Sequence, residues 1–461
     1  MIARELAGWA LGLREVPQDV AAAATRHLLD GFGTALGALR TGAAGPAIEV
    51  ARGLGGPPEA AVLGTGDLLS APAAALANGT LVHALDFDDT HAGGLVHATA
   101  VVLPAAFAVG QQTGASGREV LTAAVAGYET ACRVAAAAPH GFHARGLHAT
   151  MVAGVFSSAL IAARLLGLDA GRTVNALGIA GSQAGGLLAF LGTGASTKQL
   201  HPGFASQSGI LAARLAAAGA TGPETVFDGP HGVFDALSAH EADPASIVAG
   251  LGERWETTRI GIKPYAACQL SHATIGAVLD AMARERFGPG DVASVHARVH
   301  PDSAPVVCDT SRDLTRPASP YAAKFSLPWT VAALIADGGL ALETFEPESI
   351  ARPEVARLAA RVRWDVAGGP GVVAADAPGH VTITLTGGHE VTGSVPRSEG
   401  GGDFPLGRAS LLAKFTGNAG VPAADAEEFA RAVEALGEQP DAAAVMRAAA
   451  RLAQLTQQEN G

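Results

Sequence analysis

Apolar residues recur every three to four positions through the first half of the chain, a spacing typical of helices that bury one face. The pattern predicts helices over Asp19–Leu36, Pro72–Leu85, Ala98–Gln112, Gly117–Ala137, Ala149–Leu166 and Ser206–Ala218. Gly167 is expected to end one helix, and Asp169 to cap the start of the next. Long alternation of β-branched residues is nearly absent up to about Gly261, so we expect this part to be all-helical.

The periodicity changes after about Tyr265. Residues alternate in the manner of β-strands over Val292–Val299, Arg361–Val366, Val381–Thr386 and His389–Val395. The last two runs flank Gly387-Gly388, which predicts a hairpin with a two-residue turn. Helices are expected between the strands at His272–Arg284, Ala322–Ala336 and Arg352–Ala360, and the helical spacing returns from Leu406 to about Gln458.

With 461 residues, the chain is too long for one hydrophobic core, and two domains are the natural arrangement. We expect residues 1–264 to form the first part of an all-helical domain and residues 265–400 to form a smaller α+β domain. Residues 401–461 are expected to return to the helical domain, after a loop marked by the glycines at 400–402. The predicted fold class is therefore mainly α.

The composition of the chain argues against nucleic acid and membranes as binding partners. The 43 acidic and 31 basic residues give a net charge of −12, which would repel nucleic acid and acidic membranes. No uncharged stretch is typical of a membrane-spanning helix, and the amphipathic N-terminus does not resemble a signal peptide. The three cysteines lie far apart, without the spacing of a metal site or a disulfide framework, which favours a cytoplasmic protein.

Ionisable residues gather in one short stretch, although charged residues make up only 16% of the chain. Nine residues contain His83, Asp86, Asp88, Asp89, Thr90 and His91. Two glycines follow, and they could turn His97 back toward Asp86. Such density suggests proton transfer, which needs a group that titrates near neutrality and a partner that orients it. The alternative is that the aspartates cap helices and that His97 is an interior histidine.

Two further segments of the first half carry candidate chemistry. His148 directly precedes an apolar helix, a position that would lower its pKa and favour the neutral base, whereas His140 and His143 are interpreted as loop residues. The glycines and hydroxyls before Lys198 suggest an anion-binding loop, but the order of a nucleotide-binding loop is absent. Lys198 is interpreted as a clamp for a carboxylate, with a solvated loop lysine as the alternative.

The predicted domain boundary holds a second cluster. Lys263 lies beside a proline and a tyrosine with apolar residues following, which is unusual for a surface lysine. Cys268 has no base partner in the sequence and could equally be a small core residue. His272 opens a predicted helix and could simply cap it. Trp329 could line a pocket, although an aromatic residue in a helix usually belongs to the core.

In their order, these motifs resemble the MmgE/PrpD family. The matching stretches include His83-Ala-Leu-Asp-Phe-Asp-Asp-Thr90, Lys198-Gln-Leu-His-Pro-Gly203, Gly229-Pro-His-Gly232, Lys263-Pro-Tyr265 and Ala323-Lys-Phe-Ser-Leu-Pro328. The resemblance covers nearly the whole chain. It implies a large helical domain built from both chain ends, a smaller α+β lid and a homodimer. It also implies a site between the domains that uses no metal and no organic cofactor.

The resemblance also implies which residues form the site. Carried over by motif, they are Asp86, Thr90, His97, His148, Lys198 and Lys263, with residue 329 completing the pocket. We expect His201, Cys268 and His272 to contact the substrate as well. Trp329 stands where the decarboxylases of the family have tyrosine, and the loop from Thr90 to His97 is one residue longer. The segment from Cys268 to His272 lacks the His-Ala-Gln pattern of dedicated 2-methylcitrate dehydratases.

The family includes 2-methylcitrate dehydratases, cis-aconitate decarboxylases and an iminodisuccinate epimerase, so the implied substrate is a small anionic carboxylate. Lys198 and Lys263 would bind its carboxylates, while His97 and His148 would act as general base and acid in an unassigned order. Asp86 would orient one histidine, and Thr90 would bind substrate. Dehydration of a hydroxylated di- or tricarboxylate is favoured. Decarboxylation, epimerisation and a non-catalytic carboxylate-binding protein are the alternatives.

Overall fold

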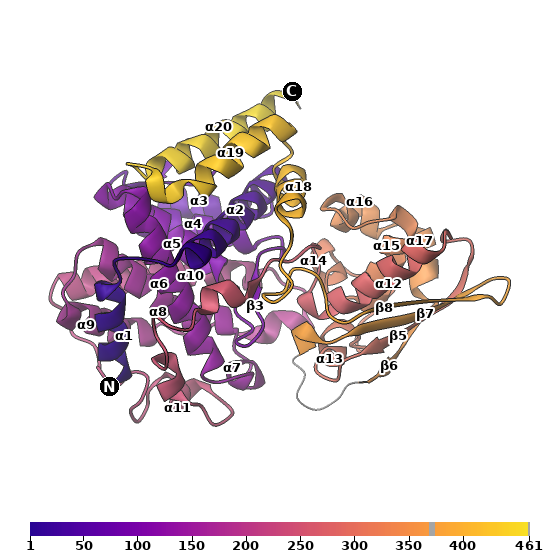
Figure 1. Ribbon diagram of the computed structural model, residues 1–461, viewed down its shortest axis with the longest axis horizontal. Helices are drawn as coiled ribbons and strands as arrows, with labels where there is room; N and C mark the ends of the chain where they lie inside the picture. Colours follow the sequence, from indigo (N-terminus) through magenta and orange to yellow (C-terminus); the bar gives the residue numbers. More distant parts are fainter. Residues whose placement is uncertain (368–373, 460–461) are drawn as a thin grey trace. The chain divides into compact units, whose positions relative to one another are not determined.

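The computed structural model describes residues 1–367 and 374–459. The chain forms two compact units, one comprising Met1–Ile262 with Gly407–Gly461 and the other comprising Lys263–Leu406 (Figure 1). Helices dominate the first unit, and the one larger sheet among the described residues belongs to the second. The prediction of a mainly α fold is confirmed.

The first unit contains most of the helices. They are α1 (Ile2–Gly12), α2 (Gln18–Arg40), α3 (Gly45–Gly53), α4 (Ala71–His83), α5 (Thr99–Thr113), α6 (Gly117–Ala136), α7 (Gly141–Ala144), α8 (Ala149–Leu165), α9 (Ala170–Gly181), α10 (Thr197–Ala217), α11 (Val233–Leu237), α18 (Arg408–Ala419), α19 (Ala423–Glu434) and α20 (Ala443–Glu459). Short strands pair as β1 (Ala60–Ala61) with β2 (Leu68–Leu69) and β3 (Thr90–His91) with β4 (Ile260–Gly261). Gly167 follows α8 with a φ of 70°, and Asp169 caps α9, as predicted.

Helix α10 differs from its prediction. It begins at Thr197, whereas the predicted helix begins at Ser206, so Pro202 and Gly203 lie within the helix. Both residues are buried inside the helix, where α10 packs against α4 and α8. Burial of this segment outweighs its weak helix propensity. Lys198 lies in the first turn of the helix, and residues 193–196 before it are non-helical, so the anion-binding loop predicted there stays a prediction.

The centre of the first unit consists of small residues in close contact. Every residue of α4 is buried, and so is every residue of α5 from its start to Gly110. Helix α4 passes close to α10, and a Cβ atom added at Gly79 would lie 2.7 Å from the backbone nitrogen of Gly203. This approach is possible because neither helix has a side chain at that point.

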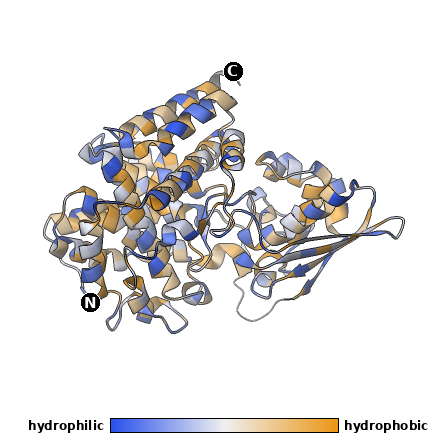
Figure 2. Ribbon diagram, in the orientation of Figure 1, coloured by the Kyte–Doolittle hydropathy of each residue, from blue (hydrophilic) through white to orange (hydrophobic). Residues whose placement is uncertain are grey.

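The C-terminal segment returns to the helical unit, where α18 and α19 pack on α2 (Figure 1). In α19 the buried residues are Ala426, Phe429, Ala430 and Val433, the spacing of one helix face. Figure 2 shows hydrophilic and hydrophobic residues alternating along α19 and α20, as is typical of helices with one face in solvent. The two ends of the chain therefore build one hydrophobic core.

The second unit combines one sheet with short helices. Its strands are β5 (Val292–Val299), β6 (Val362–Val366), β7 (Gly379–Leu385) and β8 (Glu390–Val395), in the order β6-β5-β7-β8. Its helices are α12 (His272–Arg284), α13 (Ala304–Val307), α14 (Pro320–Ala323), α15 (Leu327–Asp337), α16 (Pro347–Ile350) and α17 (Pro353–Ala359). Strands β5 and β6 are parallel, and the other pairs are antiparallel. Helices α12, α15 and α17 lie over one face of the sheet (Figure 1).

Two local predictions in the second unit need correction. The hairpin of β7 and β8 forms as expected, but its turn centres on Thr386 and Gly387, closed by the Gly388 amide donating to the Leu385 carbonyl at 2.8 Å. The single helix expected over Ala322–Ala336 is instead divided into α14 and α15. Pro328 lies in the first turn of α15, and the Ser326 hydroxyl caps that turn by accepting from the Trp329 amide at 3.2 Å.

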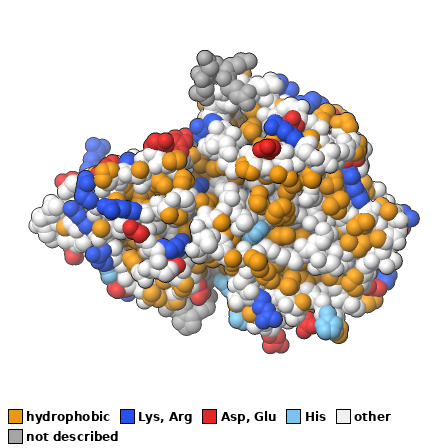
Figure 3. Space-filling model, turned by 180° about the vertical axis from the view of Figure 1, so that it is seen from behind, with side chains coloured by type: hydrophobic (Ala, Val, Ile, Leu, Met, Phe, Trp, Pro, Cys, Tyr) orange, Lys and Arg blue, Asp and Glu red, His pale blue; other side chains and the backbone are white. Residues whose placement is uncertain are grey.

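Large apolar side chains also reach the surface of the first unit. Helix α10 exposes Phe204, Leu211 and Leu215. Figure 3 shows apolar side chains gathered over much of the first unit on the face turned away from Figure 1. Within the part of the chain that the structure describes, no helix has both the length and the apolar character needed to cross a lipid bilayer.

Candidate active site

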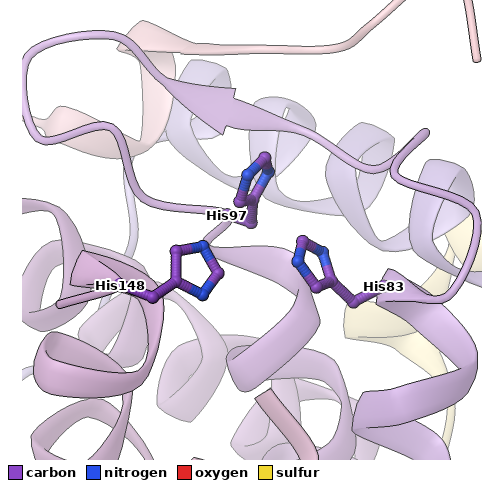
Figure 4. A group of neighbouring side chains, drawn as sticks. All are labelled: His83, His97 and His148. Atoms are coloured by element: carbon purple, nitrogen blue, oxygen red, sulfur yellow. The ribbon is translucent and has the colours of Figure 1, made fainter. Parts of the chain in front are cut away.

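Three histidine side chains meet in the interior of the first unit. His83 is the last residue of α4, His97 lies just before α5, and His148 is the N-cap residue of α8 (Figure 4). One ring nitrogen of each lies within 4.8 Å of the others. All three side chains are buried, so the surrounding protein controls their protonation. His97 and His148, assigned to one site from the sequence, are therefore neighbours in the fold.

The ring of His97 is held by the loop that precedes it. Its Nδ1 atom lies 2.8 Å from the carbonyl oxygen of Asp89, which can only accept, so Nδ1 carries the proton. The Thr90 hydroxyl lies 3.2 Å from the same nitrogen. The amide of His97 donates to the Thr150 hydroxyl of α8 at 3.1 Å. These contacts leave Nε2 as the basic nitrogen of a neutral His97.

His148 is paired with another histidine. Its Nδ1 atom lies 3.1 Å from Nδ1 of His201 in α10, so one of the two rings donates and the other accepts. Burial lowers the pKa of His148 well below its usual value, and the nearby Lys198 cation adds to the effect. Burial also lowers the pKa of His201 to about 4. The predicted direction for His148 is confirmed, although burial is the main cause instead of the helix terminus.

Lys198 is directed into the same region. Its ammonium donates to Oδ1 of Asp86 at 2.6 Å, and both side chains are buried. Asp86 takes a left-handed backbone conformation with a φ of 51°, which aspartate tolerates better than most residues. The alternative of a solvated loop lysine is therefore wrong for Lys198. The carboxylate of Asp86, expected to orient a histidine, accepts from this lysine.

A different carboxylate contacts the histidines. Oδ2 of Asp88 lies 2.8 Å from Nδ1 of His83 and 3.8 Å from Nδ1 of His97. The rings of His83 and His97 have centroids 4.6 Å apart, and those of His83 and His148 are 5.7 Å apart and stacked. Both His83 and Asp88 belong to the acidic stretch of the sequence, but no site role was predicted for either. Only the fold brings them next to the other two rings.

Asp89 belongs to a polar network behind the cluster. It accepts from the Thr99 amide at 3.0 Å and contacts the Thr99 hydroxyl at 2.5 Å, which in turn meets the Tyr128 hydroxyl at 2.7 Å. Burial raises the pKa of Asp89 to about 8, although the Thr99 hydrogen bonds oppose this. Asp89 therefore supports the start of α5 and the loop that holds His97.

The C-terminal segment contributes a residue that the sequence gave no reason to choose. Lys414 of α18 lies 2.5 Å from Oδ1 of Asp30, donates to the Phe87 carbonyl at 2.8 Å and lies over the Phe87 ring. It thereby anchors the loop between Asp86 and Asp89. The helical periodicity of this segment gave no sign of the contact, because a lone lysine on an amphipathic helix is usually solvated.

Another histidine near the cluster is His143, which was predicted to lie in a loop. It lies in the short helix α7, with its ring centroid 6.3 Å from that of His148. Burial lowers its pKa to about 4. His91, in the same acidic stretch as His83, instead pairs with Glu256 at 3.0 Å.

Four predicted site residues belong to the second unit. Lys263 and Cys268 are buried, and the Cys268 amide donates to the Lys324 carbonyl at 3.0 Å. His272 begins α12, and its Nε2 donates to the Ala267 carbonyl at 3.0 Å, so it stabilises the local turn. Trp329 is fully buried against Phe345, with ring centroids 5.6 Å apart. These contacts fit structural roles for His272 and Trp329 and leave their roles toward a substrate as predictions.

The cluster can take up a proton and bind an anion. Rings of His83, His97 and His148 are close enough to share a metal ion, as are His83, Asp86 and Asp88. The Lys198 cation next to this group would oppose a second cation.

Comparison with known proteins places the chain in a family. The MmgE/PrpD N-terminal domain matches residues 4–245, and the MmgE/PrpD C-terminal domain matches residues 265–438. The chain is 29% identical to cis-aconitate decarboxylase of Aspergillus terreus over 383 residues, 78% of this chain and 77% of that protein. It is 30% identical to the cis-aconitate decarboxylase-like protein oryM of Aspergillus oryzae over 370 residues, 76% of each chain. It is also 29% identical to cis-aconitate decarboxylase of Homo sapiens over 303 residues, 63% of this chain and 61% of that protein.

The two matches follow one another along the chain and leave few residues outside them. The resemblance drawn from the sequence motifs is therefore confirmed, and so is the prediction of an enzyme. The chain belongs to the MmgE/PrpD family and is a lyase.

Proposed function

We propose that this lyase acts on a small tricarboxylate of the cis-aconitate type and removes one carboxylate as carbon dioxide, without a metal or an organic cofactor. The observation that carries the proposal is the arrangement of buried neutral histidines beside a buried lysine. Relatives named cis-aconitate decarboxylase, at 29–30% identity, support the choice of substrate.

Decarboxylation poses one electrostatic problem, which is the electron pair left when the carbon–carboxylate bond breaks. That pair becomes a new carbon–carbon double bond, while the original double bond takes a proton at carbon. We propose that His97 or His148 supplies this proton. A trianionic substrate favours the imidazolium form of a nearby histidine, so binding itself would help to load the proton.

Lys198 is proposed to bind a substrate carboxylate. In the structure its ammonium contacts Asp86, which holds it in a fixed position. A substrate carboxylate can join or replace this contact, and burial strengthens the attraction because little water screens it. Thr90 and His201, which lie beside His97 and His148 respectively, are proposed to contact the substrate as well.

Residues of the second unit are proposed to act on the same substrate. Lys263 follows Gly261 by two residues, and Gly261 is the antiparallel partner of Thr90. A chain advances at most about 3.6 Å per residue, which keeps the Lys263 backbone within about 7 Å of that strand pair. This continuity supports Lys263 as a second carboxylate ligand. Cys268, His272 and Trp329 are proposed as neighbours of the substrate on the family resemblance alone.

We also propose the domain arrangement and assembly of the family. In this proposal, the helical unit carries the catalytic histidines, the second unit serves as a lid and the active form is a homodimer. Exposed apolar side chains on the first unit, such as Phe204, Leu211 and Leu215, support an interface there.

Dehydration of a hydroxylated di- or tricarboxylate is the second candidate. The observation that favours it is Trp329, which stands where the decarboxylases of the family have tyrosine. Its indole has no oxygen, and within the described residues its Nε1 atom has no hydrogen-bond partner. A site without that hydroxyl would bind the substrate differently. The same histidines could then remove a proton next to a carboxylate and protonate a leaving hydroxyl.

Proton NMR in deuterated water tests the proposal directly. Wild-type protein is incubated separately with cis-aconitate, citrate, 2-methylcitrate and iminodisuccinate, beside a Lys198→Met control that removes the cation but keeps the length of the side chain. We expect new vinyl signals and release of carbon dioxide from cis-aconitate. Pretreatment with a chelator should leave the rate unchanged.

Other outcomes would overturn this assignment. A vinyl product from citrate or 2-methylcitrate, without carbon dioxide, would establish dehydration instead. Deuterium uptake without net change would establish epimerisation. A rise in melting temperature with the acids, without any turnover, would mean a binding protein. Turnover by Lys198→Met equal to wild type would remove Lys198 from the site.

A further inference from the structure

The proposed mechanism leaves His83 without a task, although it lies among the other rings. Its side chain is completely buried at the end of α4. Nδ1 lies 2.8 Å from the Asp88 carboxylate, which accepts, so Nδ1 carries a proton. Within the described residues Nε2 has no hydrogen-bond partner. A buried polar atom without a partner destabilises the fold, so its presence in a folded protein needs an explanation.

The surroundings of His83 show what Nε2 can reach. His97 faces it from the chain before α5, with ring centroids 4.6 Å apart, and His148 faces it from the start of α8. Asp86 and Asp88 also lie close to His83, with carboxylate oxygens within 4.8 Å of a ring nitrogen. Lys198 and His201 of α10 complete the group of titratable neighbours, since both act on the same cluster.

These neighbours differ in how well they can hold a positive charge. His148 and His201 contact each other and lie near the Lys198 cation, which opposes any further positive charge. His83 contacts a buried carboxylate directly. A proton that enters the cluster therefore gains more from nearby negative charge on His83 than on the histidine pair.

We propose that His83, held by Asp88, is a positioning residue that stores and returns the catalytic proton through His97. When His97 becomes an imidazolium, its Nε2 gives its proton to a bridging water molecule as that water gives one of its own protons to Nε2 of His83. The charge then lies beside Asp88, and His97 returns to its neutral form with Nδ1 still bound to the Asp89 carbonyl. The reverse transfer reloads His97 for the next proton delivery. This inference deepens the proposed function and rests on it for the catalytic step.

The test compares Asp88→Asn and His83→Gln with wild type, and uses His231→Gln, at an exposed histidine, as the matched control. Asparagine can still accept the Nδ1 hydrogen bond but removes the negative charge. We expect kcat to fall about 10–100-fold in both variants, with KM changed less than about threefold. The pH profile of kcat should move to lower pH in Asp88→Asn, because an imidazolium in the cluster loses the attraction of the carboxylate. His231→Gln should match wild type.

If His83 and Asp88 had only a structural role, kcat would fall but its pH profile would not move. That result, or His83→Gln with kcat within about twofold of wild type, would overturn the inference. A second readout does not depend on turnover. In protein labelled with ¹⁵N-histidine, the titration of His97 should shift when His83 becomes glutamine, and an unchanged titration of His97 would also overturn it. If wild type turns over none of the acids, the proposed function fails, while this titration still decides whether the protonation of the two rings is coupled.

Discussion

Burial keeps several histidines of the first unit neutral. The pKa of His143 and that of His201 fall to about 4, and that of His148 falls well below its usual value, in each case chiefly because water is excluded. A neutral imidazole can accept a proton, which is the state that a general base requires. Burial of neutral histidines also lowers the stability of the protein in acid. The unfolded chain binds protons on these histidines at a pH where the folded chain does not.

His27 allows this dependence of stability on pH to be measured at a histidine with no proposed role in catalysis. It lies in α2, donates to the Thr257 carbonyl at 3.0 Å, and has a pKa lowered to about 4 by burial. The unfolded chain binds this proton near pH 6.5, so stability is lost as the pH falls from about 6.5 toward 4. Glutamine at this position can keep the hydrogen bond but cannot titrate.

We therefore expect His27→Gln to lose less stability than wild type on acidification. Urea unfolding at about pH 6.5 and about pH 4.5 should give a pH-dependent loss that is smaller by about 2 kcal/mol in the variant. His231→Gln, at an exposed histidine, should keep the wild-type dependence. An equal loss in His27→Gln and wild type would mean that His27 is not a neutral buried group.

At the scale of elements, the crossing of α4 and α10 positions the site. Helix α4 ends at His83, and the first turn of α10 carries Lys198. Between these ends, Gly79 faces the backbone of Pro202 and Gly203, where an added Cβ atom would lie 2.7–2.9 Å from three backbone atoms. Backbone atoms cannot move aside as the end of a flexible side chain can, so the two helices would have to separate.

The substitution Gly79→Ala tests this crossing. We expect it to destabilise the protein by about 1–3 kcal/mol and to reduce activity, because both ends that carry site residues would shift. Gly8→Ala in α1 is the matched control, since nothing lies within 4 Å of the added Cβ atom. It should raise stability by about 0.5–1 kcal/mol because alanine favours the helix. A Gly79→Ala protein as stable and active as wild type would contradict the role of the crossing.

The sequence predicted the helices well where periodicity and punctuation agreed, as at Gly167 and Asp169. It was wrong at the start of α10, where the predicted helix begins at Ser206 but the observed helix already includes Pro202. It also missed a break, at Pro328, because that proline begins a helix instead of interrupting one. A proline can lie inside a helix, as in α10, or in its first turn, as in α15. Only the packing of each segment decides between the two positions.

For the site, the motifs brought together Asp86, His97, His148 and Lys198, which the fold also groups. The sequence did not predict which carboxylate contacts which histidine or lysine. Asp88 lies 2.8 Å from His83, whereas Asp86, in a left-handed backbone conformation, accepts from Lys198. The contribution of Lys414, more than 300 positions away, had no local signal at all.

At the scale of the whole chain, the cluster depends on segments that are distant in sequence. His83 and His97 come from the first quarter, His148 and Lys198 from later helices, and Lys414 from the returning C-terminal helix. These segments belong to one compact unit. Membership of the MmgE/PrpD family fits this organisation, since the two family domains together span most of the chain.

The central claim is that this cluster moves a proton for a lyase reaction, and His148→Gln tests it most directly. The measurement is the turnover of cis-aconitate together with its dissociation constant, for the variant and for wild type. The account predicts that kcat falls about 10²–10⁴-fold, the usual contribution of a general acid or base. It also predicts that the dissociation constant changes less than about threefold, because Lys198 remains. Unchanged kcat, or a loss confined to binding, would contradict the account.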